Sequence, residues 1–195
     1  MTAIKKLIAR IFMFFSRWEF QPISKSLPQK TIVIGAPHSS IWDAVFMVAA
    51  IWRIGRKFQF LVKEEFMRSP LFLILKPLGG ISVDRSSPHG VVDQVVAASQ
   101  KTDDFVLVLA PEATRAEVEY WRSGFYYMAQ KADIPVTLGF IDHRTKTYGW
   151  GESIKLTGDK KAVMDQLREF YAGMTGVNPG TESVPRLRGE EEETA

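Results

Sequence analysis

The chain has 195 residues, which is the length of one domain. Hydrophobic residues make up 46% of it and charged residues 24%, a composition typical of a globular protein and not of a disordered one. Cysteine is absent, so disulfides, thiolate metal ligands and a cysteine nucleophile are excluded. Only three histidines are present, and we expect no metal site, because a multi-histidine site would need nearly all of them.

The formal net charge is +3, but the acidic end of the chain masks a larger excess of cations. Glu190 to Glu193 contribute four negative charges, so residues 1–189 carry +7. A basic body favours an anionic partner, such as a phosphate-bearing substrate, a membrane surface or a nucleic acid. No run of 18 or more apolar residues is free of charge, which argues against a transmembrane helix.

The first 18 residues predict an amphipathic helix. Its apolar stripe consists of Ile4, Leu7, Ile8, Ile11, Phe12, Phe15 and Trp18. Its only charged residues are the cations Lys5, Lys6, Arg10 and Arg17. Aromatic residues with basic charge are typical of a helix that lies in a membrane interface, which is the interpretation we favour for residues 1–20. The alternative is a helix that packs its stripe on the protein's own core.

The rest of the chain alternates between strand and helix patterns. We expect a strand at 31–36, a helix at 41–54, a strand at 58–63, a short interrupted helix at 66–78, a strand at 80–84, a helix at 89–101, a strand at 105–110, a helix at 123–133, a strand at 135–142 and a helix at 159–174. Residues 137–141 and 145–149 suggest a hairpin. This order predicts an α/β fold, with a largely parallel central sheet flanked by helices.

A single domain is expected over residues 21–176, followed by a flexible acidic tail over 177–195. Chemistry in such folds gathers at the carboxyl ends of the strands. His38 follows the first of these strands, and Asp43 stands five residues later in the first turn of a helix. That step allows the carboxylate to orient one imidazole nitrogen while the other acts as a base. Ser39 or Ser40 is expected to cap the helix. Alone, the pair is weak evidence, since a surface histidine is the simpler interpretation.

Two further loops carry polar side chains at strand ends. Arg85 precedes a helix start, and guanidinium groups and helix N-termini both bind phosphate. Residues 110–115 offer Glu112 and Arg115 in a loop stiffened by proline, suited to a substrate with hydroxyls and a phosphate. An ordinary surface ion pair is the alternative in each case. No Gly-x-Ser-x-Gly motif is present, so a base here is expected to activate a substrate hydroxyl or a water.

The order of these motifs resembles that of the bacterial lysophosphatidic acid acyltransferases, within the larger glycerolipid acyltransferase family. The family's His-x4-Asp block matches His38 and Asp43, with Ser40 at its usual position. The remaining three blocks match LVKEEFMRSPLFLILKPLGGISVDR, which supplies Lys63, Pro70, Gly79, Gly80 and Arg85; PEATR, which supplies Pro111, Glu112, Thr114 and Arg115; and Ile134-Pro135-Val136. Two departures stand out: Ala113 replaces a glycine, and Pro37 replaces an asparagine that is common in the family.

The resemblance implies an O-acyltransferase acting on a lysophospholipid, most directly on lysophosphatidate to give phosphatidate. His38 would be the general base and Asp43 its orienting acid. Arg85 and Arg115 would hold the acceptor phosphate and Glu112 its polar backbone, with Thr114 and Lys63 also binding substrate. No cofactor is expected, since acyl-CoA or acyl carrier protein would serve as the donor substrate. An anionic membrane surface is the expected partner, at the cytoplasmic face of the cell membrane, where the protein would be peripheral.

Several alternatives stay open. Ala113 leaves room for the same chemistry on another lysolipid, a lipoamino acid or a glycolipid. Water in place of the acceptor would make the chain a thioester hydrolase. A non-catalytic membrane-binding or nucleic-acid-binding protein is also compatible with the basic body, although the alternation of exposed aromatic and basic residues typical of single-strand binders is missing, and we expect no nucleic acid.

Overall fold

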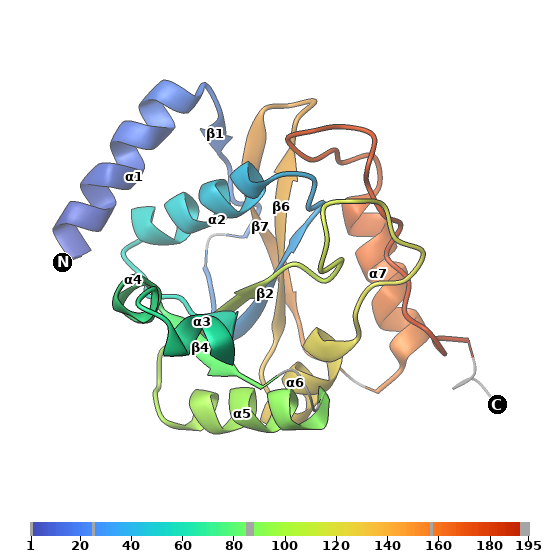
Figure 1. Cartoon of the computed structure of the whole chain (residues 1–195). Coiled ribbons are helices and arrows are strands. Elements are labelled where there is room, and N and C mark those ends of the chain that lie inside the picture. The colour runs from blue at the N-terminus through green and yellow to red at the C-terminus, as the bar shows by residue number, and fades with distance from the viewer. Residues whose placement is uncertain (1, 25, 85–87, 157, 192–195) are drawn as a thin grey trace.

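The fold is described from a computed structural model, which covers residues 2–24, 26–84, 88–156 and 158–191. Strands and helices alternate along most of the chain (Figure 1). The elements are α1 (Thr2–Ser16), β1 (Glu19–Phe20), β2 (Lys30–Ala36), α2 (Ile41–Arg53), β3 (Phe60–Lys63), α3 (Glu64–Arg68), α4 (Phe72–Leu78), β4 (Gly80–Val83), α5 (Pro88–Gln100), β5 (Phe105–Leu109), α6 (Gly124–Ala132), β6 (Val136–Asp142), β7 (Thr147–Ile154) and α7 (Lys160–Tyr171). This order confirms the α/β class.

The central sheet has the strand order β1-β7-β6-β2-β5, and only the β6–β7 pair is antiparallel. That pair is the expected hairpin. Strands β3 and β4 form a separate parallel pair, joined to β5 by a single bridge from Gln59 to Leu107. The strand β1 was not expected, because two residues are too few to show a pattern. It lies parallel to β7 at the edge of the sheet.

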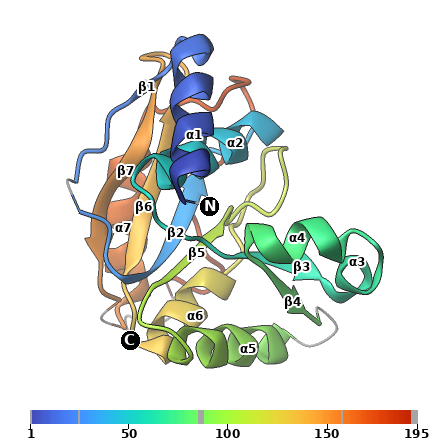
Figure 2. The same cartoon turned by 90° about the vertical axis from the view of Figure 1, so that its left-hand side faces the viewer.

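The two faces of the central sheet bury different halves of the core, because successive side chains of a strand point to opposite faces. Ile32 and Ile34 of β2 pack with residues of α5, α6 and α7, whereas Val33 packs with α1 and α2. Figure 1 shows α1 and α2 on one side of the sheet and α7 on the other. Figure 2 shows α3 and α4 standing apart from this body, above the β3–β4 pair. The sheet therefore separates a core half beneath α1 and α2 from one beneath α5, α6 and α7.

Helix α1 presents most of its apolar stripe to solvent. Ile4, Leu7, Ile8, Ile11 and Phe15 are all at least half exposed, and Phe15 is 76% exposed. The helix contacts the core through the buried Ala9 and Met13 and through two members of the stripe, Phe12 and Trp18, which are partly buried against it. Five of the seven stripe residues are thus exposed, whereas the other two pack on the protein's own core.

The described residues at the end of the chain make several contacts with the rest of the domain. Leu187 is 1% exposed and belongs to the core beneath α7. Arg168 of α7 forms an ion pair with Glu190 at 2.8 Å, and Trp121 donates its backbone N–H to the carbonyl of Arg186. Residues 183–190 therefore lie against α7 and the loop that follows β5. Glu190, one of the acidic residues that suggested a tail, is thus paired with a cation of α7.

Candidate active site

The loop after β2 carries the first candidate residues. Strand β2 ends at Ala36, the Ala36–Pro37 peptide bond is cis, and α2 begins at Ile41. Ser40 is the N-cap of α2: its Oγ accepts a hydrogen bond from the backbone N–H of Trp42 at 3.3 Å. Capping residues of this kind satisfy backbone donors that a helix start leaves unpaired. The cap fixes the first turn of α2, and with it the position of Asp43 relative to His38.

Asp43 is buried beneath the His38 turn. Its Oδ2 accepts hydrogen bonds from the backbone N–H groups of Ser39 at 2.5 Å and Ser40 at 2.6 Å. The same oxygen lies 3.6 Å from Nδ1 of His38. That separation is longer than a hydrogen bond, but it allows ion pairing once the imidazole is protonated. The two side chains therefore face each other, with the carboxylate held by backbone donors at a short distance from the imidazole.

Residues near the end of the chain complete the surroundings of this carboxylate. The backbone N–H of Val177 donates to Oδ1 of Asp43 at 3.1 Å, and that of Asn178 donates to Oγ of Ser39 at 2.9 Å. Gly176 lies so close to the Ser39 side chain that a Cβ built on it would stand 2.2 Å from Oγ. Sequence reasoning missed these contacts because they come from backbone groups, which leave no side-chain signature.

Glu112 lies in the loop after β5 and reaches the same turn. Strands β2 and β5 are neighbours in parallel register, so the residues that follow them meet at one edge of the sheet. Oε1 of Glu112 accepts a hydrogen bond from the backbone N–H of His38 at 3.1 Å. The side chain is buried, and its Oε2 has no hydrogen-bond partner among the described residues. Burial raises the pKa of this carboxyl from 4.5 to about 7, against the lowering effect of the hydrogen bond from His38.

The remainder of the PEATR segment points away from this cluster. Ala113 has a φ of 57°, in the left-handed region that favours glycine. This is the position where the resembled family has glycine. Thr114 and Arg115 are exposed, and the Oγ1 of Thr114 accepts a hydrogen bond from the backbone N–H of Ala116 at 3.4 Å. Both side chains are free to meet a ligand that approaches from solvent.

The other expected cations are Lys63 and Arg85. Lys63 is exposed at the end of β3, directly before α3. Arg85 lies outside the described residues, two positions after the end of β4. The structure thus brings His38, Asp43 and Glu112 into one cluster, whereas Lys63 and Arg115 are exposed and make no contact in common with it.

An apolar cavity of about 490 Å³ opens beside His38. We call it the His38 cavity. Its walls come from the His38 turn, α2, β3, α4, β5 and β6, and include Pro37, His38, Asp43, Phe46, Met47, Trp52, Phe60, Leu78, Val108 and Phe140. Apart from His38 and Asp43, the side chains that line it are hydrocarbon or aromatic, so the cavity fits an apolar ligand whose polar end reaches the imidazole.

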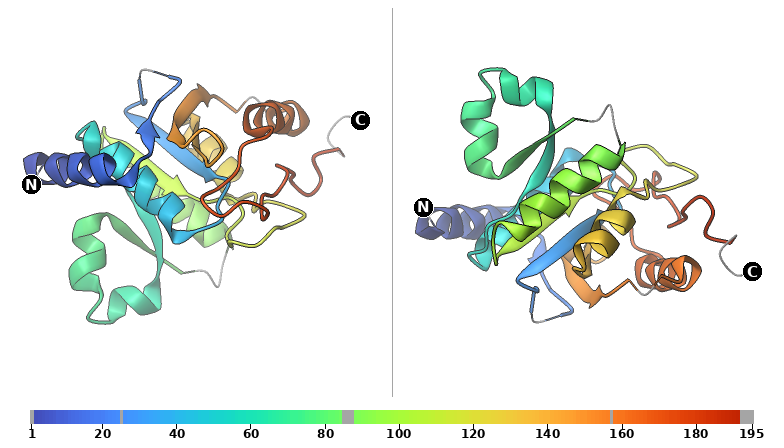
Figure 3. Two further views of the ribbon diagram at one scale, coloured as in Figure 1. Left: turned by 90° about the horizontal axis from the view of Figure 1, so that it is seen from above. Right: turned by 90° about the horizontal axis from the view of Figure 1, so that it is seen from below.

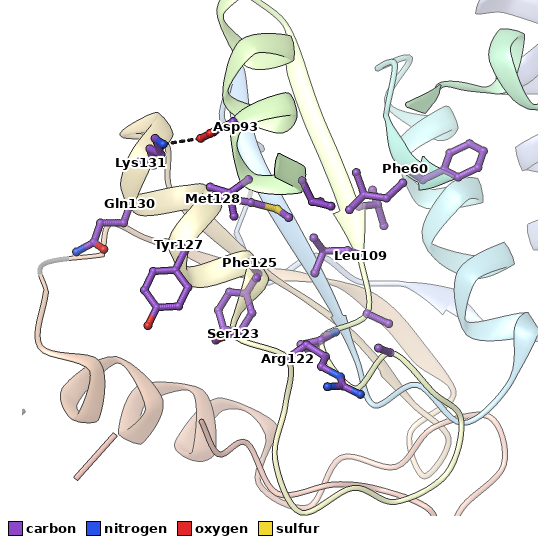
Figure 4. A pocket seen from close by; sticks show the side chains of 18 residues that line it. Phe60, Asp93, Leu109, Arg122, Ser123, Phe125, Tyr127, Met128, Gln130 and Lys131 are labelled. Carbon is purple, nitrogen blue, oxygen red and sulfur yellow. Dashed lines mark hydrogen bonds and ion pairs between the residues drawn. The ribbon is translucent and has the colours of Figure 1, made fainter. Parts of the chain in front are cut away.

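A larger cavity of about 1280 Å³ lies on the opposite face, between α5, α6 and the loop after β5 (Figure 4). Arg122 lines it, and its Lys131 pairs with Asp93 across the gap between α6 and α5. The two cavities share Phe60, Val108, Leu109 and Ala110. These residues stand where β3 departs from β5, so the wall between the two cavities is a single layer of strand residues.

The described part of the chain shows neither a metal cluster nor a spanning helix. Among the described residues, no group of three or more histidine, aspartate and glutamate side chains is placed to hold a metal ion. None of the helices formed by the described residues is both long and apolar enough to cross a membrane.

Comparison with known proteins defines the class of this fold and site. The sequence profile of the acyltransferase family matches residues 19–137, which include every residue of the cluster from His38 to Glu112. The chain therefore belongs to the acyltransferase family and is an acyltransferase. No curated protein sequence matches the chain.

A solved structure supports the same assignment at the level of the fold. The crystal structure of the 1-acyl-sn-glycerophosphate acyltransferase PlsC from Thermotoga maritima superposes with a TM-score of 0.59. The two sequences are 14% identical, and the match covers 90% of this chain and 81% of that one. The match extends beyond residues 19–137, so it includes part of the terminal regions that the family profile leaves out.

Proposed function

We propose that the protein transfers a fatty acyl group from an acyl thioester to the hydroxyl of a lysophospholipid, most directly lysophosphatidate, to give phosphatidate. The observation that carries the proposal is the imidazole of His38 in the wall of an apolar cavity, 3.6 Å from the buried carboxylate of Asp43. This arrangement supplies a general base beside a site for a hydrocarbon chain. It is the combination that an acyl transfer to an alcohol requires.

The neighbouring serines favour direct transfer over an acyl-enzyme intermediate. Oγ of Ser40 accepts the capping hydrogen bond of α2, and Oγ of Ser39 accepts a hydrogen bond from Asn178. Both hydroxyls are thus engaged in holding the turn. With cysteine absent from the sequence, the acceptor hydroxyl itself is the nucleophile in this proposal.

The proposed reaction needs no group other than His38, Asp43 and the two substrates. Nδ1 of His38 faces Asp43, so Nε2 takes the proton of the acceptor hydroxyl as that oxygen bonds to the thioester carbonyl carbon. Asp43 stabilises the imidazolium that forms, as an orienting acid does in related catalytic pairs. Collapse of the tetrahedral intermediate breaks the carbon–sulfur bond, and the proton passes from Nε2 to the leaving thiolate. The products are an ester and a free thiol, and His38 is neutral again.

The His38 cavity is proposed to hold the acyl chain. Its lining is apolar apart from the catalytic pair, which suits a chain with a thioester at one end. The acceptor phosphate is proposed to meet Arg85 and Arg115, with Lys63 and Thr114 as further contacts. Exposure of Lys63, Thr114 and Arg115 supports a phosphate that approaches from the membrane or from solvent.

Glu112 supports the His38 turn in addition to the contact with the acceptor that is proposed for it. Its Oε1 accepts the backbone N–H of His38, and its Oε2 has no hydrogen-bond partner among the described residues. Ala113 takes up the left-handed conformation despite its methyl group, so the backbone of the PEATR loop is retained. This supports an acceptor with a phosphate, while another lysolipid, a lipoamino acid or a glycolipid stays the second candidate.

Helix α1 is proposed to dock the protein on an anionic membrane surface, at the cytoplasmic face. Its exposed apolar stripe and its exclusively positive charges match the composition of interfacial helices. Each cation near such a surface contributes on the order of 1 kcal/mol. Peripheral docking of this kind would place the His38 cavity next to the bilayer in which lysophospholipids reside.

An acceptor panel tests the proposal. The purified protein is incubated with labelled acyl-CoA or labelled acyl carrier protein, and with lysophosphatidate, other lysophospholipids, a lipoamino acid or a glycolipid in phosphatidylglycerol vesicles. We expect labelled phosphatidate as the main product, from at least one of the two donors. Transfer to a different acceptor would replace lysophosphatidate in the proposal, and thioester hydrolysis faster than any transfer would contradict it.

A further inference from the structure

The segment between β3 and β4 presents a second apolar surface, separate from α1. Phe66 of α3, together with Leu71, Phe72, Leu73 and Ile74 at the start of α4, is exposed to between 41% and 66%. Four of these five residues are consecutive in the chain, and no residue of α4 is buried. We call the exposed residues 66–74 the α4 knob. Contiguous apolar exposure of this extent marks an interaction surface rather than scattered surface hydrophobics.

Its charges show which partner fits. Over residues 63–79 the charged side chains are the cations Lys63, Arg68 and Lys76 and the acids Glu64 and Glu65, a net charge of +1. Glu64 pairs with Arg68 at 2.6 Å, while Lys63 and Lys76 stand at the two ends of this segment. An apolar surface with a net excess of cations is complementary to an anionic bilayer, which accepts the hydrocarbon below its headgroups and the cations among them.

The position of the α4 knob points to the same partner. In both views of Figure 3, α1 and the α3–α4 pair project from the same side of the molecule. Helix α2, against which α1 packs, contributes Ile41 and Trp52 to the His38 cavity, and α4 contributes Leu78. The cavity therefore lies between the element that carries the first apolar surface and the element that carries the second.

We propose that the α4 knob is a second membrane-docking element, so that the protein rests on an anionic bilayer at two places with the His38 cavity between them. The proposal rests on the membrane docking of α1 described under the proposed function. Docking at two places fixes the orientation of the domain on the bilayer, which a single helix does not. It directs the cavity toward the lipid, so that an acyl chain passes between bilayer and cavity without crossing water.

Single-cysteine labelling tests the proposal, because the natural sequence has no cysteine. The variants Leu73→Cys, Phe15→Cys and Val184→Cys are labelled with an environment-sensitive nitrobenzoxadiazole probe and mixed with vesicles of equimolar phosphatidylglycerol and phosphatidylcholine. Val184 is the matched control, since it is an apolar residue that is 55% exposed in the segment after α7. We expect the emission to move to shorter wavelength, and to be quenched by doxyl-labelled lipid, at positions 73 and 15 but not at 184.

Each other outcome overturns the proposal and shows where it fails. A response at 15 without one at 73 leaves the docking of α1 intact and removes the α4 knob from the interface. No response at either position means that the membrane docking in the proposed function fails as well. A response at all three positions means that the domain loses its fold on the vesicles.

A substitution pair measures the strength of the contact. Replacing Leu73 and Ile74 together by serine is expected to weaken vesicle partitioning at least tenfold, equal to about 1.4 kcal/mol. The control Val184→Ser leaves partitioning unchanged. Because all three side chains are exposed, circular dichroism of the variants in solution is expected to match that of the natural protein. Equal partitioning of the double variant and the control would overturn the proposal.

Discussion

Replacing Glu112 by glutamine separates the charge of this buried side chain from its hydrogen bond. Glutamine keeps an oxygen that accepts the backbone N–H of His38, but it does not titrate. In the natural protein burial raises the pKa of Glu112 from 4.5 to about 7. Between these two values the folded state holds a proton that the unfolded state has released, so the stability of the natural protein falls as the pH rises through this window.

The size of the effect follows from the shift. Each pKa unit corresponds to 1.36 kcal/mol, so the two values differ by about 3 kcal/mol of stability. The free energy of unfolding of Glu112→Gln minus that of the natural protein is therefore expected to increase by about 3 kcal/mol from about pH 4 to about pH 8. Taking the difference removes the part of the pH dependence that the two proteins have in common.

Urea unfolding of both proteins across this pH range measures the difference directly. A difference that stays constant with pH would refute the reasoning, because it would mean that the carboxyl of Glu112 is not held in an apolar environment. The variant Glu112→Ala serves as a control for the hydrogen bond. It removes the acceptor of the His38 N–H as well as the charge, so it is expected to be less stable than Glu112→Gln by about 1–3 kcal/mol at every pH.

Three further predictions address other parts of the site. Val177→Pro removes the backbone N–H that donates to Asp43, so kcat is expected to fall by about tenfold or more with KM little changed. Val177→Ala keeps the donor and is expected to keep the rate, and equal rates for the two variants would contradict the role of this contact. Ala113 has a left-handed backbone conformation that glycine adopts without strain, so Ala113→Gly is expected to raise the free energy of unfolding by about 0.5–1 kcal/mol, seen as a higher Tm. A lower Tm would contradict the conformation of the loop. Replacing Ile8 and Phe15 of α1 by serine leaves the buried Ala9 and Met13 in place and is expected to reduce flotation with phosphatidylglycerol vesicles at least tenfold. Unchanged flotation would rule out docking through this stripe.

Local patterns were sufficient to predict most elements of the fold. The run from Thr31 to Ala36 is apolar or β-branched, and it forms β2 between β6 and β5 in the sheet. Ser40 was one of two expected caps, and it caps α2. Such features depend on neighbours within a few residues, which a sequence displays directly. The separation of β3 and β4 into their own pair was not predictable, because it depends on how these strands lie relative to β5, which is distant in the sequence.

The sequence predicted which residues form the candidate site better than it predicted the contacts between them. The spacing of His38 and Asp43 led to the expected juxtaposition, but the carboxylate is held mainly by backbone N–H groups and lies 3.6 Å from the imidazole. The hydrogen bond that Glu112 accepts from the His38 backbone was not predicted, and the expected contact of Glu112 with the acceptor stays a prediction. The contribution of Val177 had no sequence signal at all, because a backbone amide is present at every residue other than proline.

The amphipathic pattern of α1 left two interpretations open, and membrane docking, the one favoured from composition, stays a prediction. A stripe from Ile4 to Phe15 is compatible with a core contact and with a lipid contact. The helix attaches to the domain through Ala9 and Met13, together with Phe12 and Trp18 of the stripe. Small residues such as Ala9 carry little weight in an apolar pattern, so the attached face of the helix was not apparent from the sequence.

The most direct test of the central claim is the rate of acyl transfer by His38→Ala, measured with lysophosphatidate and the preferred thioester donor. Loss of a general base is expected to lower kcat by about 100-fold to 10,000-fold, while partitioning to phosphatidylglycerol vesicles stays at the level of the natural protein. Transfer by His38→Ala within a few fold of the natural rate would contradict the account.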